Sequence, residues 1–115
     1  FFIVWSSNAK RAKESAIIYS QNLMIPFENV IIKDELYTFD DRKLEQVIRN
    51  LDETLNHVLI IGHNPALTDF VNNLSNGFFE NIPTSGMVEI IFEQTEWLKI
   101  ASGKVNYNIF PKKLR

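Results

Sequence analysis

The apolar run at residues 58–61 (V-L-I-I) is the feature that most restricts how this chain can fold. Four apolar residues in succession leave no polar face, so we expect a strand that is covered on both sides, as in the centre of a parallel sheet. The sequence G-H-N-P follows, and it predicts a helix with Asn64 as its N-cap and Pro65 as its first residue. A strand that leads directly into a helix is the repeating unit of α/β sheets.

The same alternation occurs in the first half of the chain. Residues 1–5 (F-F-I-V-W) and 29–32 (N-V-I-I) predict two further strands of large and β-branched residues. Between them we expect a helix over residues 9–23, which Pro26 ends. Its predicted apolar face consists of Ala12, Ala16, Tyr19 and Leu23. A second helix is expected to begin at Asp40 or Asp41, with an apolar stripe of Leu44, Val47, Ile48, Leu51 and Leu55.

The second half of the chain predicts one helix followed by strands. The helix after Pro65 has an apolar face of Leu67, Phe70, Val71 and Leu74, and Asn76 and Gly77 end it. A loop over residues 77–86 is then followed by a predicted hairpin of residues 87–92 and 97–100, an edge strand at 104–110 and a basic tail at 111–115. This order predicts a single α/β domain over residues 1–115, with helices flanking a mostly parallel sheet in three layers.

The composition excludes several classes of protein. With no cysteine among the 115 residues, disulfides, thiolate metal sites and a thiol nucleophile are excluded. The formal net charge of −2 gives no general attraction to nucleic acid or to an anionic membrane. No apolar stretch approaches the roughly 20 residues that a membrane-spanning helix needs. We therefore expect a cytoplasmic protein with no metal, no cofactor, no nucleic-acid partner and no membrane association.

Two turns place chemically useful side chains where ligands bind in open α/β sheets, beyond the carboxyl ends of the strands. Each turn leads into a helix, and the N-terminus of a helix attracts anions. Arg11 follows the first strand and His63 follows the strand at 58–61, so the sequence predicts a phosphate pocket that uses both side chains. Ser7 and Asn64 stand in the same two turns and are the candidate substrate-binding residues.

Structural explanations for the same residues stay open at this point. Arg11 is also typical of a solvent-exposed helix residue without a ligand. Asn64 and Pro65 form a common helix start, which does not require a functional histidine before it. His57 stands before the strand, at the opposite end from His63, so we assign it to the surface. Lys112 and Lys113 are expected to belong to a solvated tail.

Five segments together resemble the histidine phosphatase superfamily, and most closely its small phosphohistidine phosphatases of the SixA type. S-S-N-A-K-R-A-K-E-S-A at residues 6–16 resembles the family's S-S-P-x-x-R-A-x-x-T-A, and V-L-I-I-G-H-N-P at 58–65 resembles its V-L-L-V-G-H-N-P. D-E-L-Y at 34–37, I-P-T-S-G at 82–86 and F-P-K-K-L at 110–114 resemble D-x-L-Y, L-P-T-G and P-K-x-L, in the family's order.

The resemblance implies the phosphoglycerate mutase-like fold and catalytic roles for two residues. It places Arg11 on the family's phosphate-binding arginine and His63 on its second catalytic histidine. The family's nucleophile is the histidine of an R-H-G or R-H-A motif after a first strand, and this sequence contains no such motif. We expect a segment with that motif, including the first strand, to precede residue 1 in the full protein. The alternative is a reduced protein that cannot form the phosphoenzyme.

The function implied by the resemblance is removal of phosphoryl groups from phosphohistidine on proteins, such as a histidine phosphotransfer domain, through a phosphohistidine enzyme intermediate. Larger family members have a glutamate general acid two residues after the leucine that matches Leu36, where this sequence has Thr38. Its absence favours phosphohistidine, because imidazole leaves more readily than an alkoxide, and Asp34 or Glu35 are candidate substitutes.

Two other functions are kept beside this one. The first is a non-catalytic phosphate- or phosphoprotein-binding module of the same fold. The second is an interaction domain that uses Phe78 and Phe79, although core or loop packing is the simpler explanation for that pair.

Overall fold

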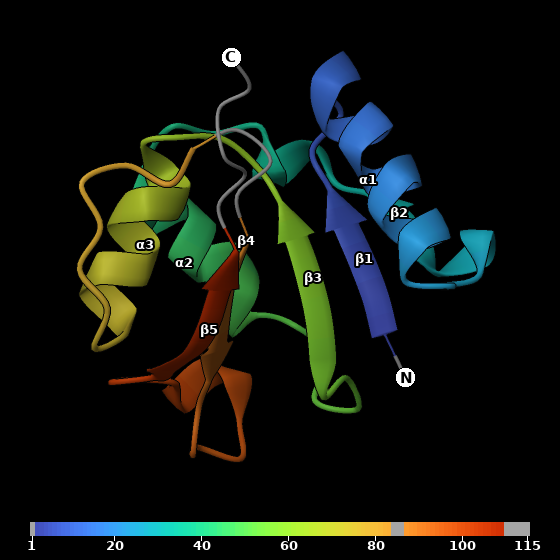
Figure 1. The fold of residues 1–115 in the computed structure, drawn as a ribbon. Coiled ribbons are helices and arrows are strands. Elements are labelled where there is room, and N and C mark those ends of the chain that lie inside the picture. Colours follow the sequence, from blue (N-terminus) through green and yellow to red (C-terminus); the bar gives the residue numbers. More distant parts are fainter. Residues whose placement is uncertain (1, 84–86, 110–115) are drawn as a thin grey trace.

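The computed structural model describes residues 2–83 and 87–109 and has the alternating α/β organisation expected from the sequence (Figure 1). The strands are β1 (Phe2–Ser6), β2 (Val30–Ile32), β3 (His57–Ile61), β4 (Met87–Ile91) and β5 (Lys104–Ile109). The α-helices are α1 (Lys10–Asn22), α2 (Asp41–Arg49) and α3 (Ala66–Leu74). Short 3₁₀ helices are η1 (Phe27–Asn29), η2 (Asp34–Leu36) and η3 (Trp97–Lys99). Residues 84–86 of the predicted loop and 110–115 at the end of the chain, which include the predicted basic tail, lie outside the described residues.

The strands β1, β2 and β3 form a parallel sheet with β1 in the middle. The register pairs Val4 with Leu59 and Trp5 with Ile60, so each pair shares one face of the sheet. Trp5 and Ile60 pack against the apolar cluster of α2 and α3, and α1 packs against the same sheet from the other side (Figure 1). The prediction that residues 58–61 form a central strand is therefore wrong for the described sheet, in which β3 lies at an edge.

The main core lies between the sheet and the helices α2 and α3. It also takes in single residues from the connecting segments. Its fully or nearly buried members are Leu36, Leu44, Ile48, Leu51, Ala66, Phe70, Val71, Leu74, Ile82 and Ile100. Leu36, whose carbonyl lies next to Gly62, and Ile82, whose carbonyl accepts the Asn64 amide, anchor two segments beside the turn at His63 in the core.

The C-terminal part of the chain differs from the prediction. β4 pairs with β5 in an antiparallel, two-stranded sheet of its own, and residues 97–99 form η3 instead of the second strand of a hairpin. Residues 97–99 do not form a strand because Trp97 is hydrogen-bonded to the segment that follows α2. The Trp97 amide donates to the Glu53 carboxylate, and its indole Nε1 donates to the Leu55 carbonyl at 2.8 Å. These bonds hold residue 97 away from a strand pairing.

In α1 and α2 the buried face differs from the apolar face predicted from the sequence. α2 ends at Arg49, although Leu51 and Leu55 beyond it still pack on the core. In α1 the buried residues are Ala12, Ala16 and Ser20, whereas Leu23 is exposed. Ser20 is accommodated because its hydroxyl donates to the Ala16 carbonyl at 2.7 Å.

The described helices show no membrane-spanning candidate, since none of them combines the length and the apolar character that crossing a bilayer requires.

Candidate functional site

The two predicted turns meet in a hydrogen bond between His63 Nε2 and Ser7 Oγ, at 2.8 Å. Ser7 directly follows β1 and is fully buried, and His63 follows β3 and is partly buried. The carboxyl ends of adjacent parallel strands lie at one edge of the sheet, which explains how residues 56 apart in the sequence come into contact. The structure thus brings together two of the four residues predicted for the site.

The start of α1 is the second part of the site. Its N-cap, Ala9, gives no side-chain cap, and the first turn contains no acidic residue. The turn begins instead with Lys10 and Arg11, whose positive charge repels the positive end of the helix dipole. α2 shows the usual solution, because the Asp40 carboxylate accepts the Arg42 amide at 2.9 Å and Asp41 adds an acid. An uncapped, basic helix start is therefore suited to an external anion.

Arg11 stands at this open helix start, four residues after Ser7. Its side chain is exposed, and within residues 2–83 and 87–109 it makes no hydrogen bond or ion pair. The guanidinium therefore keeps its donors available for phosphate oxygens, although its contact with the His63 region stays a prediction.

Asn64 has a structural task in this arrangement. Its Oδ1 accepts the Thr68 amide at 3.1 Å and the Thr68 hydroxyl at 2.8 Å, so it caps α3 from just before the first turn. Its Nδ2 donates to the Ile82 carbonyl at 2.7 Å. The helix itself starts at Ala66 with Pro65 in the cap position, one residue later than predicted. Because the amide is already used on both sides, a role for Asn64 in substrate binding stays a prediction.

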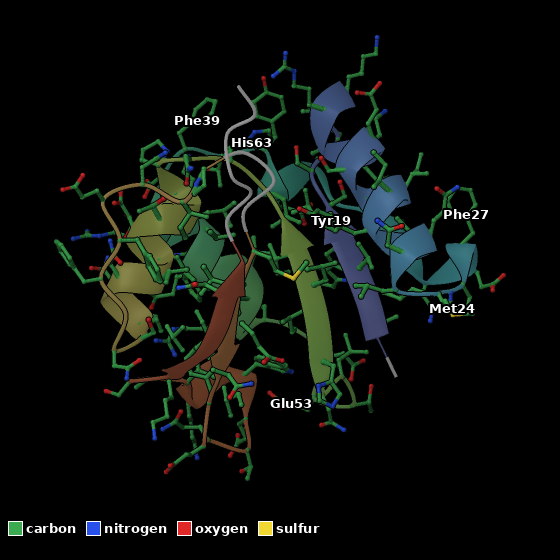
Figure 2. All side chains as sticks on the ribbon, in the orientation of Figure 1. Tyr19, Met24, Phe27, Phe39, Glu53 and His63 are labelled. Atoms are coloured by element: carbon green, nitrogen blue, oxygen red, sulfur yellow. The ribbon has the colours of Figure 1, made fainter. Side chains whose placement is uncertain are left out.

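The imidazole of His63 lies against two aromatic rings that sequence reasoning missed. The ring centroid of Tyr37 is 4.9 Å from that of His63, and the centroid of Phe39 is 5.8 Å away. Figure 2 shows Phe39 and His63 at the same end of the molecule, beyond the end of β3. The sequence signal was the Y-T-F pattern after Leu36, in which two large aromatics stand in a short connection before a capped helix.

Burial lowers the pKa of His63 from its ordinary value of 6.5. Among the described residues no carboxylate forms an ion pair with this imidazole, so nothing opposes the effect of burial. At neutral pH the ring is therefore mainly uncharged, and an anion bound beside it would favour the protonated form. The side chain can respond to a phosphoryl group by taking up a proton.

The residues considered as general acids lie in the segment beside this site. The Asp34 carboxylate accepts a hydrogen bond from the Asn8 amide at 2.9 Å, which ties η2 to the turn after β1. Glu35 is exposed, and the Thr38 hydroxyl accepts the Asp40 amide at 3.1 Å. Thr38 therefore shapes the connection into α2 and offers no carboxyl proton.

Other predicted sites have clear positions. His57 is exposed at the opposite end of β3 from His63, as predicted. Phe79 packs partly against the core, whereas Phe78 is exposed. No cluster of three or more potential metal-ligating side chains occurs in the part of the chain that the structure describes.

Comparison of the chain with protein-family models, with curated proteins and with solved structures gave no match in any of the three.

Proposed function

We propose that this protein is a phosphatase that removes phosphoryl groups from phosphohistidine on proteins, with the phosphoglycerate mutase-like fold of the histidine phosphatase superfamily. The observation that carries the proposal is the open, basic start of α1 beside the bond between Ser7 and His63. Cationic side chains and free N–H groups suit the charge and shape of a phosphoryl group. The sequence motifs supply the class of reaction, because an anion site alone does not distinguish binding from turnover.

In the proposed reaction, Arg11 and His63 stabilise charge on the phosphoryl oxygens while a second histidine attacks phosphorus. The P–N bond to the substrate imidazole breaks as the bond to the attacking nitrogen forms, and the leaving nitrogen takes up a proton. Water then attacks the phosphoenzyme and releases phosphate, which regenerates the free histidine. His57 is exposed at the far end of β3, so we assign the attack to an R-H-G or R-H-A segment outside these 115 residues.

The separation of the two sheets supports the same proposal. Among the described strands, β3 pairs only with β1, and β4 pairs only with β5. In the fold that the resemblance implies, the strand before the R-H-G motif belongs to the middle of the sheet. A chain without that strand would show two separate sheets, because the backbone groups in the middle have no partner.

Replacement of Arg11 or His63 tests the proposal in the protein assayed with a phosphorylated histidine phosphotransfer domain. We expect Arg11→Ala and His63→Ala each to lower turnover by about 10²–10³, as is typical when one charge-stabilising donor is removed. Arg42→Ala is the matched control, since it removes an exposed arginine from the first turn of the capped helix α2. Near wild-type turnover in either site variant would refute the assignment, and much faster hydrolysis of sugar phosphates would refute the substrate class.

A non-catalytic phosphate- or phosphoprotein-binding module of this fold is the second candidate. His57 lies at the opposite end of β3, so among the described residues His63 is the one histidine at this edge of the sheet. This favours a binding module, because the phosphatase reaction needs a second histidine there as the nucleophile. The two candidates differ in one measurement. A module would bind the phosphorylated protein, lose that binding in Arg11→Ala and His63→Ala, and release no phosphate.

A further inference from the structure

Two aromatic side chains, Tyr37 and Phe39, border His63 and remain more than half exposed. Their relative exposures are 53% and 57%, and their rings meet edge to face at a centroid distance of 6.0 Å. Each ring also contacts the imidazole: Tyr37 is tilted by 32° to it, and Phe39 meets it at 69°. We call Tyr37 and Phe39 the aromatic rim.

Folding does not account for the exposure of the aromatic rim. Neither ring belongs to the main core, which Leu36 already reaches from the same segment with no exposed surface. The backbone around the rings is fixed on both sides, by buried Leu36 and by Asp40, which caps α2. Two large aromatics are thus held in solvent by an ordered connection, at the border of the candidate anion site, where apolar surface stays uncovered.

We propose that the aromatic rim binds the planar ring that carries the phosphoryl group, and so selects phosphorylated imidazole or phenol side chains over phosphorylated aliphatic hydroxyls. The inference rests on the proposed function, because the phosphoryl group itself is held by His63, Arg11 and the start of α1. A ring attached directly to phosphorus lies within one bond of that group, beside the side chains that border His63.

The preference has a physical basis in ring–ring contact. Aromatic rings favour offset or edge-to-face neighbours at centroid distances of roughly 4.5–7 Å, and one such pair adds about 2- to 13-fold in affinity beyond simple burial of area. An aliphatic side chain such as that of serine presents no ring face and little area. The rim therefore discriminates by the group next to phosphorus, whereas the anion site accepts any phosphoryl group.

The test compares two non-hydrolysable ligands with the same anionic head, phenylphosphonate and methylphosphonate, by calorimetric titration of the protein. We expect phenylphosphonate to bind roughly 5- to 10-fold more tightly, and the ratio of the two dissociation constants to fall below about 2 in the double variant Tyr37→Leu, Phe39→Leu. Using the ratio cancels any loss of anion binding caused by a shift of His63. Phe27→Leu is the matched control, because Phe27 is an exposed phenylalanine on the far side of α1 (Figure 2).

The outcomes separate this inference from the proposed function. A wild-type ratio near 1, or a ratio that the double variant leaves unchanged, overturns the aromatic rim while methylphosphonate binding still supports the anion site. Methylphosphonate binding that is absent, or that survives both Arg11→Ala and His63→Gln unchanged, overturns the proposed function and this inference with it. Circular dichroism of the double variant checks that the fold is retained, as expected for side chains that are more than half exposed.

Discussion

His63 combines three features that together decide its chemistry. Ser7 holds Nε2 at 2.8 Å, the aromatic rim covers the ring, and burial lowers the imidazole pKa. When no anion is bound, the His63 imidazole takes up a proton more readily in the unfolded chain than in the folded chain. The contribution of His63 to stability is therefore complete above its ordinary pKa of 6.5, and it is lost as the pH falls through the lower value of the folded state.

Anion binding should show the opposite dependence on pH at the same residue. We expect the affinity for sulfate, whose charge does not change in this range, to rise roughly 3- to 10-fold as the pH falls from about 7.5 to about 5.5, because the bound dianion favours protonated His63. Titration followed by NMR measures the affinity at each pH. His63→Gln should flatten the curve, while His57→Gln, an exposed histidine at the other end of β3, should leave it intact. A pH-independent affinity in the wild-type protein would contradict the role given to His63.

At the scale of elements, Asn64 joins the start of α3 to the loop that carries Ile82. One face of its amide caps the helix through Thr68 and the other holds the Ile82 carbonyl. Ile82 is itself nearly buried in the core, so its carbonyl has little access to water as a replacement partner. The turn after His63 is thus kept in place by a side chain that resembled a ligand-binding residue in the sequence.

The Asn64→Ala variant should lower the free energy of unfolding by about 2–3 kcal/mol, since it removes a helix cap and leaves a buried carbonyl without its donor. Asn64→Asp should also be destabilised, because it keeps the acceptor for Thr68 but places a carboxylate oxygen against the Ile82 carbonyl. Urea denaturation followed by circular dichroism gives both values. Asn81→Ala removes only a long contact of 3.4 Å on the exposed side and should stay within about 0.5 kcal/mol of wild type. Equal losses in Asn64→Ala and Asn81→Ala would rule out this account of the turn.

At the scale of the whole molecule, the site is built on the core and not on independent loops. Leu36 is fully buried among the side chains of α2 and α3, and the aromatic rim begins at the next residue. Ile82, whose carbonyl accepts the Asn64 amide, anchors a second segment beside the site in the same core. A change in the core should therefore reach the site without touching any residue that binds the anion.

Leu36→Ala is the variant that measures this connection. We expect it to lower the free energy of unfolding by about 2–5 kcal/mol, the usual cost of a cavity left by leucine, and to disturb the His63 resonances in NMR spectra. Ile18→Ala, which truncates an exposed side chain on α1, is the control and should cost less than about 1 kcal/mol. A loss in Leu36→Ala as small as that of the control would show that the core does not support this loop.

Local patterns in the sequence determined most of the elements and half of the site. The strands β1, β2 and β3 and the helices α1, α2 and α3 follow from apolar periodicity, from turn residues and, for α2, from the cap at Asp40, all of which depend on neighbours in the chain. The closeness of the turns after β1 and β3 also follows, because parallel strands of one sheet end at the same edge, but the hydrogen bond between Ser7 and His63 was not predicted. Local patterns did not predict which distant segments pair as strands or which distant side chains come into contact.

Only the tertiary structure decided how the C-terminal segments pair and what surrounds His63. Trp97 reads locally as a strand residue, yet its bonds to Glu53 and Leu55 place it in η3 and leave β4 to pair with β5. Likewise, nothing near Tyr37 in the chain shows that its ring will lie on an imidazole 26 positions away. Both outcomes depend on contacts between segments that are distant in the sequence. Such contacts form only when the chain folds and closes the loop between them, so the residues next to Trp97 or Tyr37 do not predict them.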